Sequence, residues 1–228
     1  MQPNPRYRST SDLPRLIPVF PLRGAILLPR AVLPLNIFEP RYLAMVDTAL
    51  KRDRVIGMIQ PAGAGGPTGS PLERDAALRK VGCLGRITAF QERDDGRMLI
   101  TLAGVIRFRP VEEHATAAPF RELVVDYEPF AADLVPGLGA SEVNRSRLLS
   151  VLKDYLEQKK LAADWSAIVQ AESERLVNAL SVLAPYGTEE KQALVEARTL
   201  PERAELLTAL AEMELALMRG GGPSTNLQ

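Results

Sequence analysis

The fold of this chain is decided by the stretch Leu33-Pro34-Leu35-Asn36-Ile37-Phe38-Glu39-Pro40-Arg41-Tyr42, in which an apolar run interrupted by proline leads into a helix. Upstream, Pro18 and Pro21 interrupt a second apolar run in the same way. Proline lacks a backbone N–H and fixes φ, so within β-sheets it is confined to edge strands and bends. The pattern therefore predicts short strands at the edges or corners of a small barrel.

A helix is expected to begin at Pro40, because proline suits the first turn of a helix. Apolar residues then recur at the spacing of one helical face. They are Tyr42, Met45, Val46, Ala49 and Leu50. One face of this helix is therefore predicted to be buried.

Short β-prone runs separated by turn signals fill the chain from Leu13 to about Tyr127. The clearest hairpin is centred on Asp94-Asp95-Gly96, because apolar and polar residues alternate on both sides of it and Asp-Gly supplies the positive φ values of tight turns. The predicted strands are residues 16–20, 33–38, 55–60, 80–91, 98–109 and 121–127.

The second part of the chain is predicted to be helical. Pro136, Gly137 and Gly139 mark residues 131–140 as a linker, and beyond it the apolar residues recur at helical spacing. About four helices are expected. One helix face is marked by Leu148, Leu152, Tyr155 and Leu156, and another by Leu176, Val177, Leu180 and Leu183. The last helix is continued by Leu206, Leu210, Met213 and Leu217.

Two helix starts carry recognisable caps. Thr188 is expected to cap a helix with Glu189 and Glu190 in its first turn, where acidic side chains are favourable. Thr199 and Glu202 have the spacing of a capping box. Both helices are therefore predicted to begin near these threonines.

Several segments share a pattern in order and spacing. They are Ile17-Pro18-Val19-Phe20-Pro21-Leu22-Arg23, the stretch 33–42, Val81-Gly82-Cys83-Leu84-Gly85-Arg86-Ile87, Asp95-Gly96-Arg97, Gly104-Val105-Ile106-Arg107-Phe108, Glu189-Glu190-Lys191-Gln192-Ala193-Leu194-Val195-Glu196 and Arg203-Ala204-Glu205-Leu206-Leu207. Together they resemble the amino-terminal substrate-binding domain of Lon-type ATP-dependent proteases. The resemblance covers residues 13–218, which is nearly the whole chain.

The resemblance implies an α+β fold, with an N-terminal β-rich pseudo-barrel that is similar to PUA-type barrels and a C-terminal helical bundle. We expect a flexible arm at residues 1–12, the β-rich domain at 13–130, a linker at 131–140, the helical bundle at 141–219 and a flexible tail at 220–228. Lon proteases carry an ATPase module and a Ser-Lys peptidase module downstream, whereas this sequence ends at Gln228. The expected protein is a stand-alone recognition module without catalytic activity.

In this family the domain engages unfolded or tagged polypeptides. The resemblance therefore implies that the partner is an unfolded or extended polypeptide, or a protease or chaperone. In the second case the protein would act as an adaptor in protein quality control. Proline-interrupted edge strands offer unpaired backbone groups to such a chain, and arginines can bind its carboxylates. The candidate contact residues are Pro21, Leu22, Phe38, Arg41, Tyr42, Arg107 and Phe108.

Each of these candidates also has a structural interpretation. Strands and helices bury aromatic residues by default, which favours a core role for Phe38, Tyr42 and Phe108. Arg41 can equally pair with Glu39 and fix the start of the helix.

An RNA-binding module of the PUA type is the alternative function. Residues 1–60 carry nine Lys or Arg against four Asp or Glu, but the whole chain balances 28 basic and 28 acidic side chains. The arginines are dispersed, and an aromatic and basic cluster for base stacking is missing. Nucleic acid is therefore the less favoured partner. Self-association or docking through the helices is a third hypothesis, because amphipathic faces fit it as well as internal packing.

The chain offers few residues for catalysis or metal binding. Its one histidine, His114, is expected in a polar loop, and its one cysteine, Cys83, is expected in a strand as a small buried hydrophobe. One Cys and one His cannot supply a zinc site, and a Cys83–His114 nucleophile pair is the less favoured interpretation. G-x-S-x-G and phosphate-loop motifs are missing. We expect no catalytic residue, no metal and no cofactor.

The expected location is the cytoplasm, without membrane contact. A single cysteine cannot form an internal disulfide, residues 1–12 lack the apolar run of a secretory signal, and apolar stretches fall short of the ~18–20 residues that span a bilayer. Residues 61–78, rich in Gly, Ala and Pro, are expected to be disordered, with a functional lid as the alternative.

Overall fold

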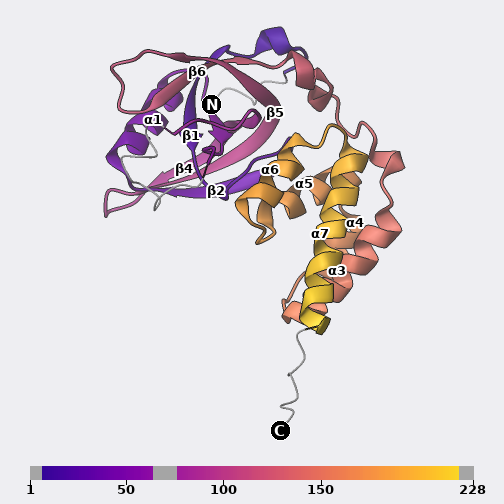
Figure 1. Cartoon of the computed structure of the whole chain (residues 1–228). Coiled ribbons are helices and arrows are strands. Elements are labelled where there is room, and N and C mark those ends of the chain that lie inside the picture. Colours follow the sequence, from indigo (N-terminus) through magenta and orange to yellow (C-terminus); the bar gives the residue numbers. More distant parts are fainter. Residues whose placement is uncertain (1–6, 64–75, 221–228) are drawn as a thin grey trace.

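A barrel of strands and a group of helices lie side by side in the computed structural model, which describes residues 7–63 and 76–220 (Figure 1). The arm, loop and tail predicted at 1–12, 61–78 and 220–228 fall wholly or partly outside these ranges. The strands are β1 (Leu16–Pro21), β2 (Val32–Ile37), β3 (Val55–Ile59), β4 (Gly82–Glu92), β5 (Met98–His114) and β6 (Arg121–Asp126). The helices are α1 (Pro40–Lys51), α3 (Arg145–Lys159), α4 (Trp165–Gln170), α5 (Ser173–Leu183), α6 (Thr188–Glu196) and α7 (Leu200–Gly220), with 3-10 turns η1 (Thr10–Asp12), η2 (Glu128–Leu134) and η3 (Ala140–Glu142).

The sheet closes into a barrel through β5. Its strand order is β2-β5-β4-β3-β1-β6, and β5 also pairs with β6. The N-terminal part of β5 lies between β2 and β4, and its C-terminal part pairs with β6. Five strands therefore form a ring, and β2 is an additional strand beside the start of β5. The α+β fold with a pseudo-barrel and a helical bundle is confirmed.

The prolines occupy two kinds of strand. β2, which contains Pro34, is an edge strand as predicted, since β5 is its one neighbour in the described sheet. The prediction is wrong for β1, which lies between β3 and β6. The two neighbours are staggered: β6 pairs with Leu16 to Val19 and β3 with Val19 to Pro21. Each proline of β1 thus has a partner strand on one side only, which leaves a side where no N–H is needed.

The β4–β5 hairpin turns at Asp94-Asp95-Gly96 as predicted. Of these residues only Gly96 has positive φ, at 78°, which fits a three-residue loop that ends in a left-handed glycine. The loop predicted around His114 is wrong, because β5 continues to His114, which lies opposite Glu122 of β6. β5 is long because it pairs first with β4 and then with β6.

Helix α1 packs against the barrel through the predicted face. Pro40 is in its first turn, and Tyr42, Met45, Val46 and Ala49 are buried. These side chains share a core cluster with residues of β1, β3, β4 and β5, among them Phe20, Ile56, Cys83 and Ile100. The apolar periodicity of this segment therefore identifies both the helix and its buried face.

The starts of α6 and α7 differ in how well they were predicted. α6 begins at Thr188 with Glu189 and Glu190 in its first turn, but Gly187 and not Thr188 is its N-cap residue. At α7, the Glu202 N–H donates to Thr199 Oγ1 at 3.2 Å, as the capping box requires. The Glu202 carboxylate, however, accepts from the Arg198 N–H, one residue before the position that a capping box predicts.

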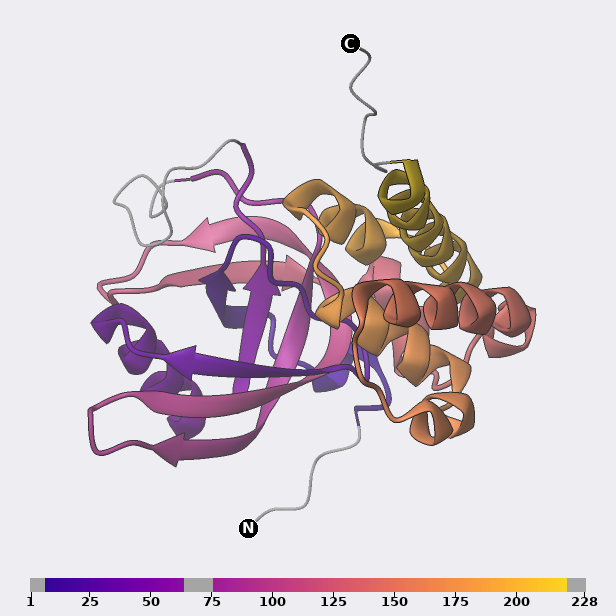
Figure 2. The ribbon, with the colours of Figure 1, turned by 90° about the horizontal axis from the view of Figure 1, so that it is seen from below.

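The apolar residues that continue the helical pattern of α7 are only partly buried. Met213 and Leu217 are 62% and 75% exposed, whereas Leu206 and Leu210 are half-buried and pack against the core. The buried apolar side chains of the helix are Leu200, Ala204, Leu207 and Leu215. α7 has apolar residues on two faces, and α3 packs alongside this helix (Figures 1 and 2). Periodicity alone does not select between two apolar faces.

A continuous core joins the barrel to the helices. One cluster of buried residues includes Ile17 and Phe108 from the barrel and Val177, Leu194 and Leu207 from α5, α6 and α7. Figure 2 shows the C-terminal helices, from α3 to α7, packed along one side of the barrel. The helices are therefore held in a fixed position against the strands.

Candidate functional site

The seven candidate contact residues are distributed over the barrel, and the structure exposes one of them strongly. Phe38, between β2 and α1, is 62% exposed. Pro21 is buried at the end of β1, and Leu22 is half-buried. Leu22 donates its N–H to the Ile59 carbonyl and packs against the core near α1. Of the aromatic candidates, Phe38 is thus the one that a partner can reach.

Arg41 and Tyr42 are engaged inside the molecule. Arg41 Nε donates to Glu39 Oε2 at 2.9 Å, and its guanidinium lies 4.5 Å from the centre of the Tyr42 ring. The Tyr42 ring is buried and lies 4.1 Å from the Phe20 ring, centre to centre. Arg41 is therefore paired with Glu39 inside the molecule, and Tyr42 is a core residue.

Arg107 and Phe108 lie in the interior of the protein. Phe108 is fully buried, and a Cβ atom on Gly82 would lie 2.6 Å from its Cζ atom. Arg107 is 3% exposed and points from β5 toward the helices, where it binds Asp133. Neither side chain is available to a partner at the surface.

An exposed surface is formed by β2 and the start of β5, and Phe38 is the one residue of it that was singled out from the sequence. Its side chains carry no formal charge, and we name it the β2 surface. It comprises Val32 (53% exposed), Pro34, Asn36, Phe38 and Leu99 (36% exposed). The sequence signal was the absence of charged residues from Ala31 to Phe38 and from Met98 to Gly104. Edge strands are usually protected by charged side chains, so an uncharged edge is unusual.

The backbone of β2 offers hydrogen-bonding groups on the outer side of the sheet. The Gly104 N–H donates to the Ala31 carbonyl at 2.9 Å, so Ala31 lies in a hydrogen-bonded pair. Such pairs alternate along an antiparallel ladder, and Val32, Pro34 and Asn36 therefore have their backbone groups directed away from β5. Pro34 has no backbone N–H, so it leaves no unpaired donor at this position of the edge. Val32 and Asn36 present both a donor and an acceptor.

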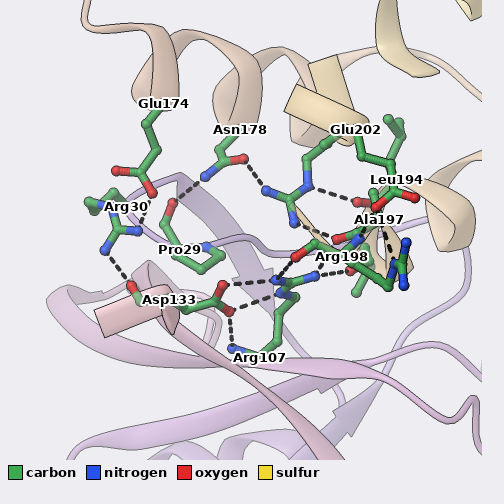
Figure 3. Close-up of polar contacts among 12 residues, drawn as sticks. Pro29, Arg30, Arg107, Asp133, Glu174, Asn178, Leu194, Ala197, Arg198 and Glu202 are labelled. Atoms are coloured by element: carbon green, nitrogen blue, oxygen red, sulfur yellow. Dashed lines mark hydrogen bonds and ion pairs between the residues drawn. The ribbon is translucent and has the colours of Figure 1, made fainter. Parts of the chain in front are cut away.

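A network of buried polar groups lies where the barrel meets the helices (Figure 3). Arg107 donates to both Asp133 oxygens at 2.9 Å and to the carbonyls of Val195 and Ala197. Arg30 forms an ion pair with Glu174.

Asn178 and Arg203 extend this network into α5 and α7. Asn178 Nδ2 donates to the Pro29 carbonyl at 2.9 Å. Arg203 donates to Asn178 Oδ1 and to the carbonyls of Leu194 and Ala197. The network therefore ties residues from the barrel, η2, α5, α6 and α7 together, and none of its members except Arg107 was singled out from the sequence as a site residue.

The network contains an arginine with an altered pKa. Burial, and then the nearby charge of Arg107, lower the pKa of Arg203 to about 10. Asp133 and Glu174 act in the opposite direction. Arg203 therefore remains a cation at neutral pH although it is 3% exposed.

Cys83 and His114 do not form a nucleophile pair. Cys83 is buried in β4 opposite Arg107, whereas His114 is exposed at the end of β5, seven residues beyond Arg107. At roughly 3.3 Å per residue this separation is about 23 Å. Burial raises the pKa of the Cys83 thiol, so the thiolate that a nucleophile requires is disfavoured.

Residues 7–63 and 76–220 contain neither a candidate metal site nor a candidate membrane span. This part of the chain holds no group of three or more His, Cys, Asp or Glu side chains that is arranged to bind a metal ion. In the same part, no helix combines the length and the apolar character that crossing a membrane requires.

Comparison with known proteins identifies the fold and the family. The family model described as the ATP-dependent protease La (LON) substrate-binding domain matches residues 16–212. The chain belongs to the Lon substrate-binding domain family. The match covers both the barrel and the helices through most of α7.

Curated relatives are Lon proteases that are much longer than this chain. Lon protease 2 of Myxococcus xanthus is 24% identical over 219 residues, which are 94% of this chain and 26% of the relative. Lon protease 2 of Thermus thermophilus is 28% identical over 213 residues, which are 90% of this chain and 25% of the relative. The chain thus spans about a quarter of the length of these relatives.

Solved structures of Lon N-terminal domains share the fold. A crystal structure of a Lon N-terminal domain protein from Xanthomonas campestris has a TM-score of 0.56 at 22% identity and covers 85% of this chain and 97% of its own. The N-terminal domain of the Mycobacterium avium complex Lon protease has a TM-score of 0.60 at 15% identity and covers 86% of this chain and 98% of its own. At these identities the likeness supports the fold and does not assign residues.

Proposed function

We propose that this protein recognises unfolded or extended polypeptide and binds it along the β2 surface. The family membership supports a substrate-binding role, and the observation that carries the site is the open, uncharged edge of β2. An extended chain that adds to a sheet edge gains backbone hydrogen bonds, while neighbouring pockets select its side chains. Val32 and Asn36 supply those backbone groups, and Phe38 supplies an exposed apolar contact at the end of the strand.

The same surface explains why binding is expected to be weakly sequence-specific. Backbone hydrogen bonds are common to all peptides, so the selective contacts are the apolar ones with Val32, Phe38 and Leu99. Pro34 removes one donor from the middle of the edge, which limits how long a strand can pair there. The bound polypeptide should therefore be apolar and extended, as segments of unfolded proteins are.

The wider role that we propose is that of a non-catalytic module that presents polypeptide to a protease or chaperone. A cytoplasmic setting is part of this proposal, because the single cysteine is a free thiol buried in β4. The chemistry of degradation or refolding would then belong to the partner.

The test is fluorescence anisotropy with labelled casein, a polypeptide that stays unfolded, and with a labelled structured RNA. We expect saturable casein binding that changes little between low and moderate salt. Phosphate contacts would instead make RNA affinity fall steeply with salt, so salt-sensitive binding to RNA alone would replace this proposal with the RNA-binding alternative.

Two variants and one control locate the site. Val32→Lys places a charge on the open edge, and Phe38→Ser removes the exposed ring, so each should weaken casein binding about tenfold. Val111→Lys is the matched control, because Val111 is 60% exposed on β5 at a distance from β2. Equal affinities for all three proteins would exclude the β2 surface as the binding site.

A further inference from the structure

A cavity of about 180 Å³ lies at the junction between the barrel and the helices, and we name it the junction cavity. Its polar wall includes Arg107, Glu174, Asn178 and Arg203, which are between 1% and 8% exposed. Its apolar lining includes Val135, Leu138, Leu200 and Pro201. The junction cavity is separate from the β2 surface, so the inference from it does not depend on that site.

Arg203 has unused hydrogen-bonding capacity in the junction cavity. A guanidinium carries five N–H groups. In the described part of the chain, Arg203 makes three hydrogen bonds, to the carbonyls of Leu194 and Ala197 and to Asn178 Oδ1. Two N–H groups of a side chain that is 97% buried therefore remain for another acceptor.

Arg203 also has no counter-ion among the described residues. Asp133 is paired with Arg107, and Glu174 is paired with Arg30. All three of Arg203's acceptors are neutral. The buried network thus has three arginines and two carboxylates, an excess of one positive charge. Burying a cation without an opposite charge is costly, and one monovalent anion would offset that excess.

The remaining lining of the cavity indicates which chemical group is attached to the bound anion. Val135 and Leu138 are 52% and 56% exposed, so an apolar surface lies between the cavity and solvent. Arg198 and Glu142 also line the cavity. Arg198 is paired with Glu202, and Glu142 is exposed, so water screens its negative charge. A cavity of about 150 Å³ is large enough for benzene, so the junction cavity can hold a carboxylate together with an aliphatic side chain.

We propose that the junction cavity binds a carboxylate that adjoins an apolar group, with the two free N–H groups of Arg203 donating to the carboxylate oxygens. Charge-assisted hydrogen bonds of this kind are the strongest that a carboxylate makes with a protein. The apolar neighbour contacts Val135 and Leu138. Two sources have this chemistry: the C-terminus of a polypeptide that ends in an aliphatic residue, and an acidic side chain beside an aliphatic one.

Three labelled peptides distinguish the sources by fluorescence anisotropy. The first is Ser-Ala-Ser-Ala-Leu with a free C-terminal carboxylate, the second is the same peptide with a C-terminal amide, and the third is Ser-Ala-Ser-Glu-Leu amide. Binding of the first at least about tenfold tighter than the second identifies a chain end as the ligand. Binding of the third but not the first identifies an acidic side chain. Equal affinity for all three, or no binding, overturns the proposal.

Variants at the cavity mouth test the location without disturbing the buried network. Val135→Asn and Leu138→Asn should weaken binding of the preferred peptide about fivefold by removing apolar contacts. Glu142→Gln should strengthen it, because one negative charge near the carboxylate is lost. Val111→Asn, an exposed valine away from the cavity, should leave it unchanged.

Arg203→Met tests the donor itself, provided that its circular dichroism and thermal transition remain those of a folded protein. Binding of the preferred peptide should then be lost. A folded Arg203→Met protein that retains wild-type affinity overturns the proposal. If this variant does not fold, unchanged affinity in Val135→Asn, Leu138→Asn and Glu142→Gln overturns it as well.

Discussion

Arg107 and Asp133 form a two-point ion pair between β5 and η2. Arg107 Nε and Nη2 donate to the two carboxylate oxygens at 2.9 Å each, and the Arg107 backbone N–H donates to Asp133 Oδ2 at 3.0 Å. The side chains of Arg107 and Asp133 are 4% and 10% exposed. Because Arg107 also donates to carbonyls beyond α6, this pair couples the barrel, η2 and the helices.

Asp133→Asn should destabilise the fold by about 3 kcal/mol, because it leaves the buried Arg107 cation without its counter-ion. The measurement is the free energy of unfolding in urea. Asp47→Asn is the matched control: Asp47 pairs with Lys51 on the surface of α1, and losing an exposed pair should cost less than about 1 kcal/mol. Similar losses in both variants would show that the buried pair does not hold the junction together.

Gly104→Ala should be much more damaging than Gly187→Ala. A Cβ atom on Gly104 would lie 1.9 Å from the Leu28 carbonyl oxygen, so the backbone would have to move, at a cost of roughly 3 kcal/mol or more. A Cβ atom on Gly187 would meet the flexible end of Glu190, and its cost should stay near 1 kcal/mol, the value of a weakened helix cap. Thermal unfolding checks both. Equal stability of the two variants would contradict the close approach of β5 to Leu28.

The strands and α1 were predictable because their signals are local. Asp95-Gly96 marks its own turn, and the residues that follow Pro40 carry the period of a helix within one segment. The position of β1 inside the sheet was not predictable in this way. It depends on the stagger of β3 and β6 on either side of Pro18 and Pro21, which no local pattern records.

The polar junction was not predictable for the same physical reason. Its charged residues are far apart in the sequence, and a charged residue taken alone is expected at the solvated surface. They are Arg30, Arg107, Asp133, Glu174 and Arg203. Residues 131–140 have the Pro and Gly content of a linker, yet this segment contains Asp133, whose carboxylate binds Arg107. The candidate contact residues that proved buried were chosen for their residue type. Residue type alone does not determine whether a side chain points toward the core or toward solvent.

Three tyrosines should contribute a fall in the free energy of unfolding as the pH rises above 10, whereas Arg203 and Lys191, whose pKa values are lowered in the folded protein, contribute in the opposite direction. Burial, and then the charge of Glu214, raise the pKa of Tyr186 to about 12 from 10.0, and burial also raises the pKa values of Tyr127 and Tyr155. Between pH 10 and 12 these tyrosines lose their protons in the unfolded chain and keep them in the folded protein, so the contribution of the three tyrosines to stability declines with pH.

Tyr186→Phe isolates one of these groups. The variant should show a shallower decline in the free energy of unfolding between pH 10 and 11 than the wild type, and the same pH dependence between pH 7 and 9. Urea unfolding at several pH values measures both ranges. Identical slopes above pH 10 would mean that Tyr186 titrates alike in the folded and unfolded protein.

The two apolar faces of α7 can be told apart by truncation. Leu207→Ala and Leu215→Ala remove side chains that are 4% exposed, so each should cost about 2 to 5 kcal/mol. Met213→Ala and Leu217→Ala remove side chains that are 62% and 75% exposed, and each should change stability by less than about 0.5 kcal/mol. The four variants share one helix and similar residue types, so helix propensity affects them alike. Large losses at Met213 and Leu217 that grow with protein concentration would show that this face is covered by a second copy, because only association makes stability depend on concentration.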